Sequence, residues 1–424
     1  MIRKKISGLL ILYLWSSTLF SQSISKSQWL SDIDYLQKTL PVKHIDYFTV
    51  KTRKEFNESI EKVKSDIENL NDLAVAFRLQ QVIASFGDSH TRVNWTKMAD
   101  ATKRLPIGFN WFSDGIFIYT TTKNYENQLG NKLLKIGNVP VQAAIDSLSS
   151  LITVDNYSLV KRDLPAILAY AKVLEYFKFI DSDTVHLDLW DPVTGDTLED
   201  QLFIIPVEKP DKSEYVALTP KRKRMYVPDY GKYFDSEYIP DEQIYYIQYN
   251  RCWSRELEEK YGDQEKAQKL PSFEDFEEKV LIDIKKDSIT KLIFDLRANG
   301  GGNSLQGTEF IEKLYSLKKV RKEMKVYVLI GRNTFSSAVL NVLDFREFSN
   351  VVIVGEETSG KPNHFGEVER FALPNSGLEI AYSTKFFRRT AENSPSIKPD
   401  VFITLSISEF LNGDSPSYEY VKAQ

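Results

Sequence analysis

The chain has 424 residues, of which 42% are hydrophobic and 27% are charged. This composition is typical of a globular protein with a sizeable core and argues against intrinsic disorder, and the length favours two or three domains. The formal net charge of −4 and the lack of a basic stripe argue against nucleic acid as a partner. The densest cationic run, Lys221 to Arg224, is interpreted as a solvated loop.

Residues 1–22 have the pattern of a secretory signal peptide. Cationic residues from Arg3 to Lys5 precede the apolar run from Ile6 to Trp15, and Ser21 suits the −1 position of a cleavage site. The alternative is an uncleaved N-terminal anchor. No later segment reaches about 18 apolar residues, so we expect no integral membrane segment in the mature chain. The sequence therefore predicts export, to the periplasm or the medium, and carries no signal for an oligomeric state.

Residues 23–104 are predicted to form an N-terminal helical region. Apolar side chains recur there at helical spacing: Trp29, Ile33, Leu36 and Leu40, then Phe56, Ile60 and Val63. From 105 to 208 the pattern changes to short strands and turns, interrupted by a helical stretch over about 157–180. This pattern of short strands and turns predicts a separate strand-rich module.

Residues 209–242 are rich in Lys, Asp, Pro and Tyr without clear periodicity, and they are predicted to be a linker. From 243 to 424 apolar strands alternate with helices, which predicts an α/β layer with parallel strands. The expected strands are 244–249, 291–296, 326–330 and 351–354. The single cysteine, Cys252, excludes an intramolecular disulfide.

A glycine-rich loop, Asp295-Leu-Arg-Ala-Asn-Gly-Gly-Gly302, follows one of these strands. Consecutive glycines at the carboxyl end of a strand permit close backbone approach and leave N–H groups unshielded. Such a loop suits an anion or an oxyanion at the start of a helix. A plain tight turn is the alternative.

The next loop, Asn333-Thr-Phe-Ser-Ser-Ala338, lies between an apolar strand and an apolar helix. A serine at the start of a helix is usually only its cap. The alternative is a nucleophile whose developing oxyanion is met by the N–H of the next residue, Ser337, and by the helix dipole.

A third loop, Gly355-Glu-Glu-Thr-Ser-Gly-Lys361, fits the nucleotide-binding pattern G-x-x-x-x-G-K and follows a strand. Pro362 stands where that pattern needs Ser or Thr for magnesium, and its ring removes an N–H donor, which argues against nucleotide. Lys361 can instead serve as a general base if burial and neighbouring dipoles favour its neutral form. The default interpretation is a solvated lysine.

The segment Phe86-Gly-Asp-Ser-His-Thr-Arg92 contributes His90, which is either a structural histidine or a catalytic base. No metal is expected, because the pattern H-E-x-x-H is absent and the histidines show no metal-ligand spacing. The four histidines are His44, His90, His186 and His364.

Taken together, these loops resemble the S41 family of tail-specific (C-terminal-processing) serine peptidases. Residues 295–302 are similar to that family's D-L-R-x-N-x-G-G, residues 334–338 to its nucleophile segment, and residues 355–361 to its G-E-x-T-x-G-K. The separation between Ser336 and Lys361, 361 − 336 = 25, is the family's usual spacing and selects Ser336 over its neighbour.

The resemblance extends to Asp88-Ser-His-Thr91, which is similar to the family's D-x-H-T, and to Pro399-Asp400, which is similar to its closing P-D. It spans about 80–405 and implies an α/β fold with a mixed-sheet S41-type peptidase core. The implied parts are an N-terminal helical region over 23–104, a PDZ-like module with a helical insertion over 105–208, a linker over 209–242 and the catalytic core over 243–424. The module is expected to bind a peptide, or to gate the site, at a sheet edge.

The sequence also departs from the family. Val339 stands where many members have a glutamate, and Ser359 stands where many have an aromatic residue. His90 is absent from the bacterial branch that uses a Ser–Lys dyad. A second branch, which resembles the tricorn protease, uses a histidine with a serine and a distant glutamate, and Ser89, His90 and Glu392 match that group.

The resemblance implies acyl transfer from peptide bonds of exported proteins or peptides, without a metal or organic cofactor. Ser336 attacks, Lys361 is favoured over His90 as the general base, and the N–H groups of Gly301 and Ser337 hold the oxyanion. One rival keeps the fold without the activity, as in the interphotoreceptor retinoid-binding proteins, which carry ligands. The other rival is the nucleotide-binding loop.

Overall fold

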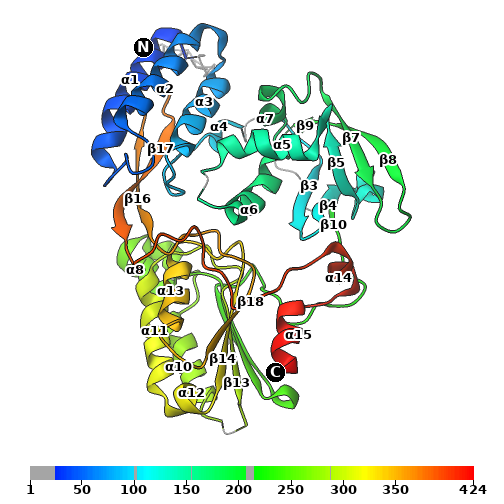
Figure 1. Ribbon diagram of the computed structural model, residues 1–424, viewed down its shortest axis with the longest axis vertical. Coiled ribbons are helices and arrows are strands. Elements are labelled where there is room, and N and C mark those ends of the chain that lie inside the picture. Colours follow the sequence, from blue (N-terminus) through cyan, green and yellow to red (C-terminus); the bar gives the residue numbers. More distant parts are fainter. Residues whose placement is uncertain (1–23, 100–102, 154, 207–213, 287) are drawn as a thin grey trace, which may run out of the picture.

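The computed structural model describes residues 24–99, 103–153, 155–206, 214–286 and 288–424. The expected signal peptide lies outside these ranges. The described chain has three parts, namely an N-terminal group of helices, a strand-rich module beside it, and a sheet layered with helices below them (Figure 1). None of the described helices has the length and apolarity needed to cross a bilayer.

The N-terminal part is helical, as the periodicity predicts. Its elements are α1 (Lys26–Lys43), α2 (Arg53–Ser65), η1 (Ile67–Asn69), α3 (Asp72–Ala84), β1 (Arg92–Val93) and α4 (Thr96–Ala99). The side chains of Ser25, Thr52 and Asn71 cap the first three α-helices by accepting backbone N–H groups. The apolar faces of these helices are buried against one another, and Trp29 is fully buried.

The strand-rich module is an antiparallel sheet of order β10-β4-β5-β7-β8, with β3 paired to β4 and β6 to β5. Its strands are β3 (Ile107–Phe112), β4 (Gly115–Thr122), β5 (Lys132–Ile136), β6 (Val139–Pro140), β7 (Thr184–Trp190), β8 (Thr197–Phe203) and β10 (Tyr215–Ala217). Its helices are η2 (Lys123–Gln128), α5 (Val141–Leu148), η3 (Ser149–Leu151), α6 (Tyr157–Ile167) and α7 (Ala171–Tyr176). The short strands β2 (Lys103–Arg104) and β9 (Ile205–Pro206) pair beside the sheet. The helical stretch expected over 157–180 is thus two helices, α6 and α7.

The lower sheet has the order β11-β12-β13-β14-β15-β18, and only β11 runs antiparallel to its neighbour. Its strands are β11 (Phe234–Ile239), β12 (Ile244–Tyr249), β13 (Lys291–Asp295), β14 (Lys325–Ile330), β15 (Val351–Gly355) and β18 (Val401–Phe402). Both faces are buried, which explains the continuous apolar strands in the sequence. Leu292 and Phe294 face one layer of helices, whereas Ile293 faces α15 on the other side.

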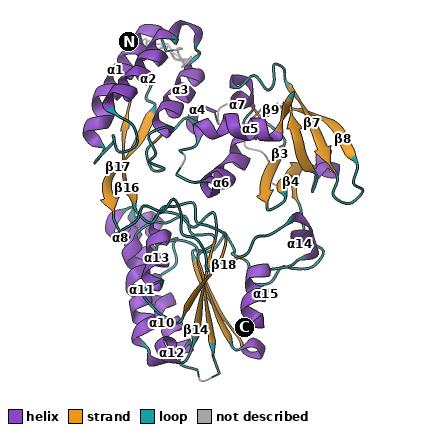
Figure 2. Cartoon of the chain, viewed as in Figure 1, coloured by secondary structure: helices purple, strands orange, loops and turns teal. Residues whose placement is uncertain are grey.

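Helices cover the two faces of this sheet unequally (Figure 2). One face carries α10 (Phe273–Asp283), α11 (Ser304–Ser316), α12 (Lys318–Lys322) and α13 (Ser337–Phe345), and the other carries α15 (Pro416–Ala423). The connecting elements are η5 (Pro240–Glu242), α8 (Arg255–Tyr261) and α9 (Gln264–Ala267). This α/β layer agrees with the fold class expected from the sequence.

Two C-terminal segments leave this layer, which the sequence does not indicate. The hairpin of β16 (His364–Ala372) and β17 (Glu379–Phe387) pairs with β1 and packs against the N-terminal helices. The helix α14 (Ile407–Asn412) packs against β3 and β4 of the module. The expected linker also contains strands, because β10 joins the module's sheet and β11 joins the lower one. The boundary expected at 243 therefore does not separate the parts in space. The β16–β17 hairpin and α14 follow it in the sequence, but they pack against the N-terminal helices and the module.

Candidate active site

The three motif loops meet at one edge of the lower sheet. They follow the carboxyl ends of β13, β14 and β15, which are adjacent and parallel. Carboxyl ends of parallel strands lie at the same sheet edge, where ligands of open α/β sheets bind. The strand order therefore brings together residues that are far apart in the sequence.

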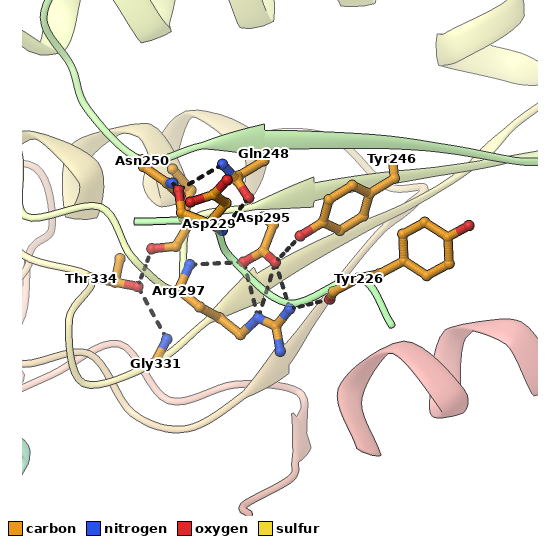
Figure 3. A network of polar contacts seen from close by, with 10 residues as sticks. Tyr226, Asp229, Tyr246, Gln248, Asn250, Asp295, Arg297, Gly331 and Thr334 are labelled. Atoms are coloured by element: carbon orange, nitrogen blue, oxygen red, sulfur yellow. Dashed lines mark hydrogen bonds and ion pairs between the residues drawn. The ribbon is translucent and has the colours of Figure 1, made fainter. Parts of the chain in front are cut away.

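Buried polar contacts fix the first two loops (Figure 3). Asp295 is fully buried and accepts hydrogen bonds from Arg297 Nε and Nη2 at 2.5–3.1 Å and from Tyr246 Oη at 2.6 Å. Thr334 Oγ1 bridges the loops, because it donates to the Leu296 carbonyl at 2.8 Å and accepts the Gly331 N–H at 3.1 Å. Buried charges need such full pairing, so this network holds the loops in one arrangement.

Ser336 does not behave as an ordinary helix cap. It precedes α13 with φ +54° and ψ −125°, and its side chain makes no capping hydrogen bond. A positive φ is strained for a residue with a Cβ and is characteristic of nucleophiles on sharp strand-to-helix turns. The neighbouring Ser337 is engaged differently, since its hydroxyl donates to the Gly302 carbonyl at 2.7 Å. The geometry thus distinguishes the two serines.

Two glycines make this turn possible. A Cβ on Gly301, whose φ is +103°, would lie 2.8 Å from Ser336 Cβ and 3.1 Å from Ser337 N. A Cβ on Gly360 would lie 3.0 Å from Ser336 N and 2.7 Å from a methyl group of Val339. The loops at 295–302 and 355–361 therefore both approach Ser336 closely. Neither Gly301 nor Gly360 could carry a side chain without a shift of its neighbours.

The expected role of Gly301 as an oxyanion donor needs correction. Its N–H donates to Asn299 Oδ1 at 2.8 Å, so this donor is already used within its own loop. Gly301 instead leaves the space beside the Ser337 N–H open. Of the two expected donors, Ser337 is the one whose N–H adjoins Ser336 at the start of a helix, where the dipole favours negative charge.

His90 forms a hydrogen bond with Ser336. Its Nε2 lies 3.0 Å from Ser336 Oγ, although the two residues are 246 positions apart. His90 as a residue is 8% exposed, and its ring stacks on Phe335, with 4.7 Å between ring centroids. Burial lowers the pKa of His90 to about 4, and Asp88 opposes this shift only in part. A neutral imidazole can accept a proton from the serine hydroxyl.

Asp88 orients the segment that carries His90. Its Oδ1 accepts the His90 N–H at 2.9 Å and lies 3.8 Å from His90 Nδ1. Its Oδ2 accepts hydrogen bonds from His44 at 3.0 Å, Thr91 at 2.5 Å and Ser383 at 2.7 Å. Burial would raise the pKa of Asp88, but these bonds and the nearby His90 lower it to about 2, so the carboxylate is charged. His90 Nδ1 has no hydrogen-bond partner among the described residues.

Lys361 forms an ion pair with Asp155. Its Nζ is 3.4 Å from Asp155 Oδ1 and its side chain is 28% exposed. In the described part of the chain, no hydrogen bond joins Lys361 to Ser336. His90 is therefore hydrogen-bonded to Ser336, whereas Lys361 is paired with a carboxylate. This arrangement differs from the expectation, drawn from the motif spacing, that Lys361 is the general base.

The other expected group, Ser89 with Glu392, is not assembled. Glu392 is exposed, and only its backbone carbonyl is engaged, by Asn363 and Thr390. The carboxylate beside the Ser89 hydroxyl is Asp155, whose pKa is raised by burial and lowered in part by Lys361 and Ser89. The glutamate was selected from its distant position in the family pattern, which does not specify the path of the intervening chain.

Comparison with solved structures identifies the architecture. Mature CPAF complexed with lactacystin matches with a TM-score of 0.65 and 14% sequence identity, over 94% of this chain and 98% of that chain. Mature CPAF alone matches with a TM-score of 0.61 and 14% identity, over 94% and 96%. The chain has the fold of mature CPAF. No family model and no curated protein matches the sequence.

The match to CPAF covers nearly the whole chain and confirms the expected α/β fold; at this identity it shows the fold alone. The tricorn protease matches with a TM-score of 0.44 and 14% identity, over 94% of this chain and 36% of that chain. This score is too low to decide the architecture.

Several residues of the site escaped the sequence analysis. Asp155 and Asn156 come from the module, and the Asn156 amide donates to the carbonyls of Ser359 at 3.1 Å and Pro395 at 2.6 Å. Arg162 donates to Ser359 Oγ at 3.0 Å and lies 4.5 Å from the centroid of the Phe335 ring. Nothing in their spacing marks these residues, because they belong to no motif and act across the junction between module and core.

A cleft of about 310 Å³ opens beside this junction. Asp155 and Lys361 line it together with residues of α3 and η3, and with Val50 and Gly87. Among the described residues, no three His, Cys, Asp or Glu side chains gather as metal ligands. The polar groups that face one another are a serine, a histidine and carboxylates, which suit proton transfer and nucleophilic attack.

Proposed function

We propose that the protein is a serine peptidase that cleaves polypeptides through an acyl-enzyme formed on Ser336. The observation that carries this proposal is the 3.0 Å hydrogen bond between His90 Nε2 and Ser336 Oγ, with the serine held in a strained turn. Nucleophile and base within hydrogen-bond reach, with a third group orienting the base, is the arrangement of an activated nucleophile. The S41 resemblance of the motifs supports peptide bonds as the substrate, and the N-terminal pattern supports export.

In the proposed reaction, Ser336 Oγ attacks the scissile carbonyl while His90 Nε2 takes the hydroxyl proton. The Ser337 N–H stabilises the oxyanion, and the proton passes from His90 to the leaving amine. Water then attacks the acyl-enzyme as His90 takes its proton, and His90 returns that proton to Ser336 Oγ as the ester bond breaks and the acid product leaves. Asp88 faces the other ring nitrogen and stabilises the imidazolium that forms in both steps. Lys361 is assigned to the ion pair with Asp155.

Active-site labelling tests the nucleophile directly. A fluorophosphonate probe should label the wild-type protein, and Ser336→Ala should abolish labelling and lower peptide hydrolysis by several orders of magnitude, about the loss seen when a nucleophile is removed. Ser337→Ala is the matched control, and it should keep most of the labelling because the variant retains its backbone N–H. Labelling that survives Ser336→Ala and disappears in Ser337→Ala would refute the assignment.

A further inference from the structure

A second, larger cavity adjoins the back of the nucleophile loop. It has a volume of about 810 Å³ and lies where the lower sheet, the module and the chain between them meet. Gly331, Arg332 and Asn333, which lead directly to Ser336, form part of its wall. Tyr119 of β4, Leu218 and Phe410 supply apolar surface. A cavity of this size holds a ligand as large as a short extended peptide segment.

The charged groups of this cavity are mostly cationic. Lys223, Arg224 and Arg332 line it and form no ion pair with any described residue. A fourth cation, Arg297, is neutralised by Asp295. The only carboxylate among the lining residues is that of Glu356. Three unpaired cations therefore face one anion, which attracts a negatively charged ligand.

One of these cations is held in position by the surrounding chain. Arg224 donates from Nε to the Asp414 carbonyl at 2.8 Å and lies over the Phe410 ring, which leaves its other nitrogens available. Arg332 Nη2 lies 3.4 Å from Asn110 Oδ1 of the module, a contact too long to fix its position. Guanidinium groups suit carboxylates, which they bind through paired N–H donors.

We propose that this cavity binds an acidic segment of the polypeptide substrate, with carboxylate side chains on Lys223, Arg224 and Arg332. The inference rests on the proposed function, because adjacency to the nucleophile loop is what makes the ligand a substrate. The apolar wall favours a polypeptide over a small free anion, since a peptide fills both the charged and the apolar surface. The run Lys221 to Arg224, interpreted from sequence as a solvated loop, thus gains a recognition role at two of its four positions.

Binding of paired peptides to the Ser336→Ala protein tests this proposal without any need for hydrolysis. The probes are two fluorescein-labelled peptides of equal length, one alternating Asp with Leu and the other alternating Asn with Leu. The Asp peptide should bind about tenfold more tightly, and this preference should shrink as salt rises. Lys223→Gln and Arg224→Gln, in the same background, should each reduce the preference, and the double variant should reduce it further.

Lys221→Gln is the matched control, because it removes the same charge from the same run but Lys221 does not line the cavity. It should keep the preference. Lys223 is exposed, so Lys223→Gln remains informative even if Arg224→Gln impairs folding. Equal binding of the two peptides, or a preference that the cavity variants leave intact, would overturn the proposal. So would an oligonucleotide that binds the cavity while the Asp peptide does not.

The outcome is separable from that of the proposed function. If the wild-type protein hydrolyses no peptide but the Ser336→Ala protein shows the charge preference, the cavity inference stands for a binding protein and the peptidase proposal fails. If the wild-type protein hydrolyses peptides but the charge preference is absent, the peptidase proposal stands and the cavity inference fails.

Discussion

The backbone at Ser336 adopts a conformation that costs on the order of 1–3 kcal/mol. It persists because neighbouring groups hold it on both sides: Thr334 ties the loop to Leu296, and the Phe335 N–H donates to the Asn299 carbonyl at 3.0 Å. In this conformation the hydroxyl forms a hydrogen bond with His90 and makes no capping bond to the helix. A serine that only capped α13 would require none of these contacts.

Substitution of the two candidate bases gives a sharp prediction at this scale. His90→Ala should lower acylation by several orders of magnitude, because it removes the group that accepts the Ser336 proton. Lys361→Ala should retain substantial activity, since Lys361 contacts Asp155. Rates of fluorophosphonate labelling measure both, with circular dichroism as the check on folding. An inert, folded Lys361→Ala beside an active His90→Ala would restore lysine as the base.

The pH dependence gives a second prediction. His90 must be neutral to accept a proton, and burial, with the cationic Arg92 and Arg162 and the nearby His364, lowers its pKa to about 4 against the opposing effect of Asp88. Activity should therefore stay level at mildly acidic pH and decline only as the pH falls through about 4. The kcat/KM of a small peptide, measured from neutral pH downward on folded protein, checks this. A decline centred between about pH 6 and 7, as for an ordinary histidine, would contradict it.

A third prediction concerns Gly301. In Gly301→Ala the new methyl group would lie 2.8 Å from Ser336 Cβ and 3.1 Å from Ser337 N, on a backbone of positive φ. We expect an activity loss of about 100-fold or more, the size of effect seen when an oxyanion donor is lost. Gly377→Ala is a suitable control, because it also has positive φ but has open space around its Cβ position. Equal loss in both variants would assign the effect to backbone strain.

At the scale of elements, the hairpin of β16 and β17 connects the core to the N-terminal helices. Ser383 of β17 donates to Asp88, and His364 of β16 stacks near His90 with 5.7 Å between ring centroids. The turn of the hairpin is held by Asp32 of α1, whose carboxylate accepts the backbone N–H groups of Asn375 and Ser376 at 2.8 Å. The hairpin thus links the site to the far end of the molecule.

This connection predicts that Asp32→Ala destabilises the protein although Asp32 is remote from Ser336. Two backbone N–H groups of a part-buried turn lose their acceptor, which costs up to about 1–3 kcal/mol for each group left unsatisfied. Denaturant unfolding should show a lower free energy of unfolding, and Asp32→Asn, which keeps one acceptor oxygen, should show a smaller loss. Unchanged stability in Asp32→Ala would mean that water replaces these bonds at no cost.

At the scale of the whole molecule, the three parts share their interiors. One apolar cluster contains Trp29 of α1, Leu133 of the module and Ile380 of the hairpin. The catalytic groups are divided in the same way, since His90 comes from the N-terminal part and Ser336 from the core. We expect no part to be catalytically competent alone, because each supplies residues that the others lack.

Asn156 offers a test of the junction between module and core. Asn156→Asp keeps the oxygen that caps α6 and removes the two N–H donors to Ser359 and Pro395. The carboxylate would face these carbonyls, so we expect looser docking of the module and lower turnover of long substrates, by about tenfold, with less effect on a short reporter. Asn156→Ser, which caps without added charge, separates lost donors from repulsion. Equal effects on long and short substrates would argue against gating by the module.

The sequence by itself determined the local elements and the motif loops. These are the helical periodicity, the apolar strands and the loops at 295–302, 333–338 and 355–361. Each depends only on residues that are neighbours in the chain, so each can be recognised from the sequence. The resemblance of these loops to the S41 motifs also singled out Ser336 as the candidate nucleophile. The parallel direction of the strands, which places the loops at one edge, followed from the alternation of strands and helices.

Only the tertiary structure decided which partner reaches Ser336. Lys361 is nearer in sequence, but its side chain is paired with Asp155, whereas His90 is brought in across 246 positions. The path of β16 and β17 back to the N-terminal helices, and the meeting of Lys223, Arg224 and Arg332 in one cavity, were likewise beyond the motifs. Contacts of this kind depend on how whole elements pack, and a spacing along the chain does not specify a distance in space.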